Sequence, residues 1–160
     1  MIDCFLQMPL ELCGAGTAGL SLLETNADGE QQLRWTNHAG KLAHYVGGTT
    51  PRNFSPCGIA LDRMSPQLFA YPGRYFQYIN QVDVPIVEEP VIPFHMGTKT
   101  EGTIWIVSHN EDSQFDSEGA LILSSLAEFV ARTLHLARLS AANSTSAGNR
   151  AQSPSLSEQT

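Results

Sequence analysis

The stretch VEEPVIPFHMGTKTEGTIWIVSH, residues 87–109, decides the fold class. It contains two extended apolar runs, 87–96 and 101–109, joined by Gly-Thr-Lys-Thr at 97–100, a combination typical of a β-hairpin. In the second run Ile104 and Ile106 alternate with Thr103, Trp105 and Val107, so apolar side chains point to both faces of the strand. Both faces must then be covered, as in a sheet that lies between helices.

A long helix is predicted after this hairpin, from about residue 116 to 139. Asp116 is the predicted N-cap, and Phe115 is placed to pack against Ala120 as a hydrophobic staple. The helix carries two apolar stripes, and a sheet can cover only one of them. The first stripe consists of Leu123, Leu126 and Val130, and the second of Ile122, Phe129 and Leu136.

The residues before 87 predict further elements of both kinds. A short helix is expected over 2–12, with Pro9 as a kink or early stop, and a hairpin over 18–24 and 31–37. The segment 41–86 is less regular. Within it, Ser55 and Pro56 are typical of a helix start, so a helix is expected over 57–63. We expect a short strand at 67–71, a short helix at 74–80 and a loop at 82–85.

Together these elements predict one α+β domain over residues 2–140. From Ala141 onward the composition is dominated by Ala, Ser, Asn, Thr, Gly and Gln, with little to bury. Residues 141–160 are therefore expected to form a disordered tail.

Charge and cysteine content exclude several classes of function. Nine Lys and Arg against sixteen Asp and Glu give a net charge of −7, which disfavours nucleic acid and anionic membranes as partners. No apolar run suggests a membrane span. The three cysteines lack metal-ligand spacing, as do the histidines, so no metal site is expected. Free thiols are typical of a reducing cytoplasm, which is the predicted location.

Over roughly residues 2–138 the chain resembles a GAF domain, most closely those of bacterial sensor histidine kinases. The segments that carry the resemblance are AGLSLLE (18–24), FSPCGIA (54–60), PVIP (90–93), GTIWIV (102–107) and FDSE (115–118). The resemblance implies a central antiparallel sheet of five or six strands, with the first and last helices on one face. The segment of about 41–86 would roof a pocket on the other face.

The resemblance also implies a function. We expect a non-enzymatic sensory domain that binds a small molecule of unknown identity and signals through its terminal helices. A homodimer through these helices is expected, with a kinase or response regulator as a further partner. One alternative is a dimerisation module without a pocket, whose interior Phe54, Phe69, Phe76 and Tyr78 would fill.

Cys57 is the most prominent candidate for the site. At a helix start its thiolate would be stabilised by the helix dipole, which would suit a redox or ligand-contacting thiol. The competing interpretation is a small buried residue that packs under the roof. The expected ligand-binding residues are Phe54, Cys57, Arg63, Phe69, Arg74, Tyr78 and Trp105.

A second alternative is a thiol-dependent free methionine sulfoxide reductase that uses Cys57, since such reductases are also GAF proteins. Their chemistry needs a second thiol nearby, and the region 74–85 contains no cysteine. The sequence also disfavours a bilin, because no cysteine precedes a histidine, and a cyclic nucleotide, because Glu111 replaces the expected lysine. His95 is a conceivable haem ligand, but a hydrogen-bonded sheet histidine is the commoner case.

Overall fold

The computed structural model describes residues 2–96, 99–112 and 115–150, and these residues form one six-stranded sheet with strand order β3-β2-β1-β6-β5-β4. All the paired strands are antiparallel. The predicted α+β class is confirmed. The strands are β1 (Thr17–Thr25), β2 (Gln31–Gly40), β3 (Thr49–Pro51), β4 (Gln67–Ala70), β5 (Glu88–Met96) and β6 (Lys99–Val107).

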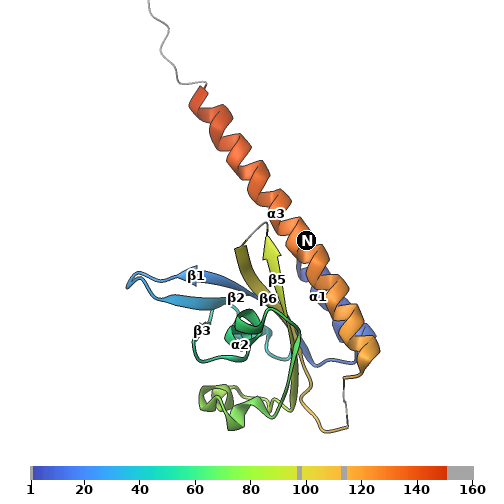
Figure 1. The fold of residues 1–160 in the computed structure, drawn as a ribbon. Coiled ribbons are helices and arrows are strands. Elements are labelled where there is room, and N and C mark those ends of the chain that lie inside the picture. Colours follow the sequence, from blue (N-terminus) through green and yellow to red (C-terminus); the bar gives the residue numbers. More distant parts are fainter. Residues whose placement is uncertain (1, 97–98, 113–114, 151–160) are drawn as a thin grey trace, which may run out of the picture.

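Helices α1 (Ile2–Leu12) and α3 (Ser117–Arg150) lie side by side on one face of this sheet (Figure 1). Alternate residues of β5 and β6 meet them: Ile92, Ile104 and Ile106 are buried together with Leu123 and Val130 of α3. Each such side chain contributes roughly 1.5–3 kcal/mol when it leaves water. The first predicted stripe of α3 is therefore the one that covers the sheet.

The other face is covered by the irregular segment between β2 and β5. This segment contains β3, β4 and the short helix α2 (Pro56–Arg63), with one-turn helices η1 (Ala43–Tyr45), η2 (Pro72–Arg74) and η3 (Gln77–Gln81). Ser55 caps α2 as predicted, since its hydroxyl accepts a hydrogen bond from the Gly58 amide at 3.0 Å. Val91, Trp105 and Val107 of the sheet are buried against Cys57 and Leu61 of α2.

Several local predictions need correction. Instead of one helix over 74–80, the chain forms two separate 3₁₀ turns, Pro72–Arg74 and Gln77–Gln81, and the edge strand β3 was not predicted. Pro9 does not end α1, because a proline in the third turn can be tolerated where only one backbone hydrogen bond is lost, and the helix continues to Leu12.

The predicted boundary at residue 140 also differs from the structure. Helix α3 continues to Arg150, although the side chains of 141–146 are exposed. Residues 151–160 of the predicted tail and residues 97–98 of the predicted hairpin turn lie outside the described residues. By length and composition alone, Ser117–Ser146 could cross a membrane, which the sequence prediction did not anticipate. This is a weak indication, because core helices pass the same test and one face of α3 is buried on the sheet.

Candidate ligand pocket

A partly open cavity of about 50 Å³ lies between the sheet and its irregular cover. Its walls come from β2, β5 and β6 below and from α2 and η3 above. The residues that matter for its chemistry are Trp35, His38, Thr50, Cys57, Tyr78, Glu89 and Trp105. Its volume is about one third of that of a roughly 150 Å³ cavity able to hold benzene, so a ligand larger than one or two water-sized groups would need the cover to move.

Trp105 forms the floor of this pocket. Its indole N–H donates to the Ser21 hydroxyl at 2.9 Å, which fixes the ring across β1. The Trp35 ring lies edge-on at 6.5 Å between centroids, and the His38 ring is nearly perpendicular at 4.9 Å. These are the tilted and edge-to-face arrangements that aromatic pairs favour. The pocket therefore has a rigid aromatic side.

Glu89 places a carboxyl group inside this apolar pocket. The residue is 7% exposed, and burial raises the pKa of its carboxyl to about 8. Its Oε2 has no hydrogen-bond partner among the described residues. A buried carboxyl without a charged partner prefers its neutral form, because desolvation penalises the charged one.

His38 contributes a second polar atom, and its tautomer follows from its contacts. Nδ1 lies 2.9 Å from the Leu42 carbonyl oxygen, which can only accept, so Nδ1 carries the proton. Burial lowers the pKa of the imidazole, which keeps the ring neutral. Nε2 is then an acceptor, and within the described part of the chain it has no partner.

Cys57 lies in the pocket wall at the start of α2, but it is not an activated thiol. Burial, and next the charge of Glu89, raise the pKa of the thiol to about 12. The expected stabilisation by the helix dipole is outweighed, because desolvation of a fully enclosed thiolate costs more than one short helix returns. The interpretation of Cys57 as a small buried residue agrees with this environment.

The other two cysteines lie on the opposite side of the sheet. Cys4 is exposed on α1, and the Cys13 thiol is 3.9 Å from the Gly119 carbonyl of α3. All three cysteines of the chain are free in the structure. No second thiol therefore lies on the pocket side of the sheet with Cys57.

The remaining predicted site residues lie at the rim or outside. The Tyr78 hydroxyl donates to the Phe54 carbonyl at 3.0 Å, and Tyr78 lines the pocket while the Phe54 side chain is 53% exposed. Phe69 packs beneath the cover near Phe76, with ring centroids 6.4 Å apart. Phe54, Phe69, Phe76 and Tyr78 form a cluster beside the cavity but do not fill it.

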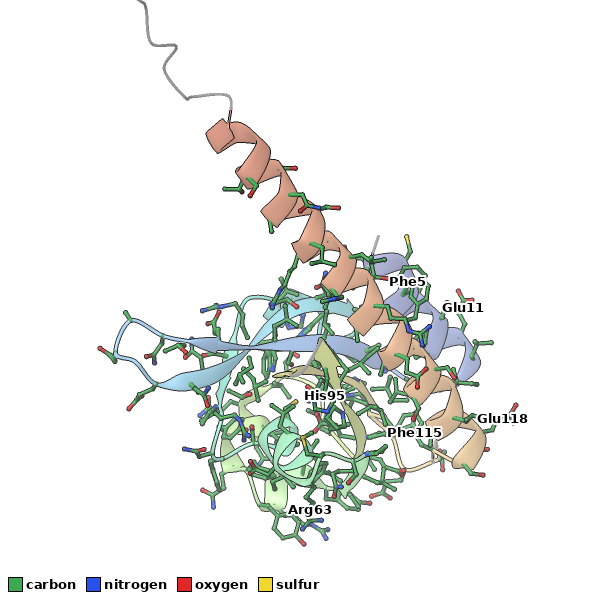
Figure 2. The ribbon with its side chains drawn as sticks, turned by 45° about the horizontal axis from the view of Figure 1, so that its top comes forward. Phe5, Glu11, Arg63, His95, Phe115 and Glu118 are labelled. Carbon is green, nitrogen blue, oxygen red and sulfur yellow. The ribbon has the colours of Figure 1, made fainter. Side chains whose placement is uncertain are left out.

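Neither predicted arginine reaches the pocket. Arg63 donates to Gln67 Oε1 at 3.0 Å and lies on the outer side of α2, away from α1 and α3 (Figure 2). Arg74 is exposed and stacks over the Tyr71 ring at 4.4 Å, beside a separate shallow hollow. Both placements correct the expectation that cationic side chains face the ligand. Of the predicted set, Cys57, Tyr78 and Trp105 lie together in the cavity wall.

Comparison with solved structures identifies this architecture. The GAF-B domain of DevS from Mycobacterium smegmatis is similar at a TM-score of 0.68 and 18% identity, over 87% of this chain and 93% of that one. The GAF domain of a two-component sensor histidine kinase from Bacillus halodurans is similar at a TM-score of 0.64 and 16% identity, over 88% and 98%. The chain has the GAF fold. No family model and no curated protein matches the sequence.

One comparison corrects the prediction that this chain is not an enzyme. The free methionine-R-sulfoxide reductase from Neisseria meningitidis, solved in complex with its substrate, is similar at a TM-score of 0.70 and 21% identity, over 87% of this chain and 78% of that one. An enzyme is therefore as similar in fold as the signalling domains are. The sequence argument rested on the absence of a second cysteine near Cys57. That absence does not rule out enzymatic activity for a protein of this fold.

Glu89, His38, Thr50 and Trp35 were missed as site residues. Glu89 was the one with a visible signal, because it lies two positions before Val91 in an alternating strand and so falls on an apolar, buried face. An acidic residue at such a position marks a buried polar site. His38 and Trp35 carry no comparable pattern, because a bulge at Thr36 of β2, opposite Leu20 and Ser21 of β1, sets their register.

Proposed function

We propose that this GAF domain binds a small molecule in the pocket under α2 and η3 and passes the binding event to α1 and α3. The observation that supports this most directly is a largely apolar cavity lined by a few buried polar atoms, which is the usual form of a small-molecule site. The signalling domains among the similar structures agree with a regulatory role.

The strands β5 and β6 provide a physical connection between pocket and helices. On β6, Trp105 and Val107 face the pocket side, while the neighbouring Ile104 and Ile106 pack under α3. On β5, Glu89 and Val91 face the pocket, and Ile92 and Phe94 face α3. A ligand that shifts either strand moves residues on both faces, because successive side chains share one backbone.

A thermal-shift screen of a metabolite library tests the binding function. A compound that acts in the pocket should stabilise the wild type and the Tyr75→Ala variant, whose lost ring is 71% exposed. It should fail to stabilise Trp35→Ala, which removes part of the pocket wall. Compounds that stabilise the protein should also change the rate of amide hydrogen exchange in α3. A library without any hit, or hits unaffected by Trp35→Ala, would contradict the proposal.

A second candidate function is reduction of free methionine sulfoxide, favoured by the reductase among the similar structures and by the Cys57 thiol in the pocket wall. The sulfoxide oxygen would leave as water, with two electrons supplied by an added dithiol such as dithiothreitol. Incubation of the protein with methionine sulfoxide and dithiothreitol should then yield free methionine, and Cys57→Ser should abolish it. Turnover that is absent, or unchanged in that variant, removes this candidate.

We also propose that two copies associate through α1 and α3, with a kinase or response regulator as a downstream partner. Phe129 of α3 packs against Phe5 of α1 with the rings tilted by 56° and their centroids 4.6 Å apart, yet it remains 47% exposed. Figure 2 shows Phe5 beside α3, at the outer surface of this helix pair. Leu12 of α1 is 60% exposed, and Leu121 and Leu136 of α3 are 69% and 64% exposed. A second copy related by two-fold symmetry is the commonest cover for such a surface.

A further inference from the structure

We propose that His109 couples the cover of the pocket to both terminal helices, so that movement of residues 82–86 changes how the ends of α1 and α3 are held. This inference rests on the proposed function and adds the route from the pocket to the helices. It starts from the size of the cavity. At about 50 Å³, the cavity admits more than one or two water-sized groups only if part of its cover moves.

Residues 82–86 are a weakly held part of this cover. Val82 and Ile86 line the cavity. Within the described part of the chain, however, residues 83–86 form no hydrogen bond between main-chain groups. Helix α2, in contrast, buries several side chains in the core, so its displacement would expose apolar surface to water. The segment 82–86 can therefore move at a lower cost in free energy than α2.

Side chains from two other parts of the chain hold this segment. The Asp83 amide donates to the Tyr45 hydroxyl at 3.0 Å, and Asp83 Oδ2 lies 3.2 Å from His44 Nε2, so η1 holds one end. At the other end, the Pro85 carbonyl accepts from His109 Nδ1 at 2.7 Å. Movement of the segment would break these side-chain contacts and leave the pairing of the strands intact.

His109 also contacts the start of β1. Its Nδ1 carries the proton, because the Pro85 carbonyl can only accept. Burial lowers the pKa of the imidazole, which favours the neutral ring, so Nε2 accepts from the Thr17 hydroxyl 2.7 Å away. The ring also lies against Gly16, where a β-carbon would collide with Cδ2. One side chain thus joins the cover to residues 13–16, the link between α1 and β1.

The chain after His109 leads into α3. Strand β6 ends at Val107 and α3 begins at Ser117, so His109 lies at the start of the link between them. The two helices meet at the far end of this link, where the Cys13 thiol is 3.9 Å from the Gly119 carbonyl. Figure 1 shows the end of α1 and the start of α3 together at one end of the helix pair. His109 therefore touches the cover and belongs to, or packs on, both links to the helices.

The coupling follows from these contacts. When residues 82–86 move away from the cavity, the Pro85 carbonyl leaves Nδ1 and the imidazole loses the bond that orients it. The ring then holds Thr17 and Gly16 less firmly, and both links become less constrained. Coupling between two sites is reciprocal, so a change at Gly16 must also alter how firmly the cover is closed.

Labelling of Cys57 measures the opening of the cover without any ligand, because this thiol is buried in the cavity wall. The probe is iodoacetamide at pH 8, with mass spectrometry of digests. Acrylamide quenching gives an independent measurement, since the two tryptophans of the chain both line the cavity. Amide hydrogen exchange in residues 13–16 and in the first turns of α3 measures the response at the helix ends.

The first variant removes the imidazole. His109→Ala should raise the labelling rate of Cys57 about fivefold or more, since two hydrogen bonds are lost, and should speed exchange at both helix ends. His135→Ala, at an exposed position of α3, is the matched control and should change neither. His109→Asn keeps a donor close to the position of Nδ1, so it should label nearly as slowly as the wild type. If His109→Ala does not fold, His109→Asn and Gly16→Ala provide the test.

The second variant tests the coupling from the side of α1. Gly16 does not line the cavity, yet a β-carbon there would displace the His109 ring, so Gly16→Ala should speed the labelling of Cys57. Gly29→Ala is the control. Its φ of +81° strains alanine, but its β-carbon meets no atom within 4 Å, so it destabilises the chain without reaching His109. In the His109→Ala background, Gly16→Ala should add nothing further.

The remaining outcomes also decide the matter. Labelling of Cys57 that stays unchanged in either His109→Ala or Gly16→Ala overturns the inference, as do additive effects in the double variant. An equal increase in Gly29→Ala would mean that general destabilisation opens the cover. Equal labelling of the Asn and Ala variants would contradict the role of the Pro85 hydrogen bond.

Faster labelling without faster exchange at the helix ends would show a cover that opens without any coupling, which also overturns the inference. None of these results depends on a ligand. The metabolite screen above therefore judges the proposed binding function separately.

Discussion

Gly19 of β1 lies directly opposite Trp105 of β6, and the indole occupies the space that a side chain at position 19 would fill. A β-carbon built at Gly19 would collide with the six-membered ring of Trp105. The floor of the pocket therefore depends on a residue that has no side chain. Ser21, two positions along the same face of β1, then accepts the indole N–H.

Gly19→Ala should accordingly displace Trp105 and destabilise the protein by about 1–3 kcal/mol, the usual range for overpacking a core. Chemical denaturation measures the loss, and the tryptophan emission maximum should shift to the red. Trp105→Leu removes the ring, so the double variant Gly19→Ala/Trp105→Leu should be more stable than the two single effects predict. Additive effects would show that the collision is relieved elsewhere.

Glu89→Gln should make stability less dependent on pH. In the unfolded chain the carboxyl pKa is near 4.5, and burial raises it to about 8 in the native state. The stability contributed by the neutral carboxyl is fully present below pH 4.5, is lost progressively as pH rises, and is gone above about pH 8. Melting temperatures of variant and wild type should diverge from pH 5 to 8, with the variant higher. If the melting temperatures of the two proteins changed with pH in parallel, this would contradict the burial of Glu89.

Cys57 should resist alkylation in the native protein. Its thiol is enclosed and has a pKa of about 12, whereas Cys4 is exposed. Iodoacetamide at pH 8 should label Cys4 first and Cys57 only after unfolding, as mass spectrometry of digests would show. Cys57→Ser should fold and cost about 1 kcal/mol, since a buried thiol is replaced by a hydroxyl. Rapid native labelling of Cys57 would indicate an open pocket.

Phe129→Glu should dissociate the proposed dimer, because a charge buried at an interface without a partner is strongly unfavourable. Leu136→Glu, at a position of α3 that is 64% exposed, should do the same. Tyr75→Glu is the control, since Tyr75 is 71% exposed and belongs to the segment that covers the opposite face of the sheet. Sedimentation at micromolar concentration distinguishes the states. A wild-type monomer would contradict the proposal outright.

Removal of residues 141–160 should change neither the melting temperature nor the oligomeric state. Residues 141–146 are exposed, and the whole removed segment contains a single leucine and no aromatic side chain. Calorimetry and sedimentation of the shortened chain provide the comparison. A decrease of several degrees would show that this segment packs somewhere.

The sequence predicts this fold well and its pocket only in part, for physical reasons that differ between residues. Alternation in 101–109 indicates a strand with two buried faces, and Asp116 caps α3 as expected, with Oδ1 accepting from the Gly119 amide at 2.9 Å. The pocket depends on long-range register instead. His38 faces Trp105 because of a β-bulge, and Arg74 turns outward onto Tyr71 because two 3₁₀ turns replace the expected helix. Neither the bulge nor the 3₁₀ turns produce a periodic pattern in the sequence.

Helix α3 consists of two stretches that are helical for different reasons. Up to Leu134 its side chains pack on the core, whereas from 135 to 146 every side chain is exposed. The exposed stretch ends in Leu-Ser-Ala-Ala-Asn-Ser-Thr-Ser, mostly weak helix formers, and an isolated helix of this length is marginal in water. This stretch is therefore helical because it continues the part of α3 up to Leu134, which is held on the core. A loosening at the sheet would unwind the far end, and each lost turn withdraws about 5.4 Å of helix. The helical length of the exposed end of α3 therefore depends on how tightly the preceding stretch packs on the sheet.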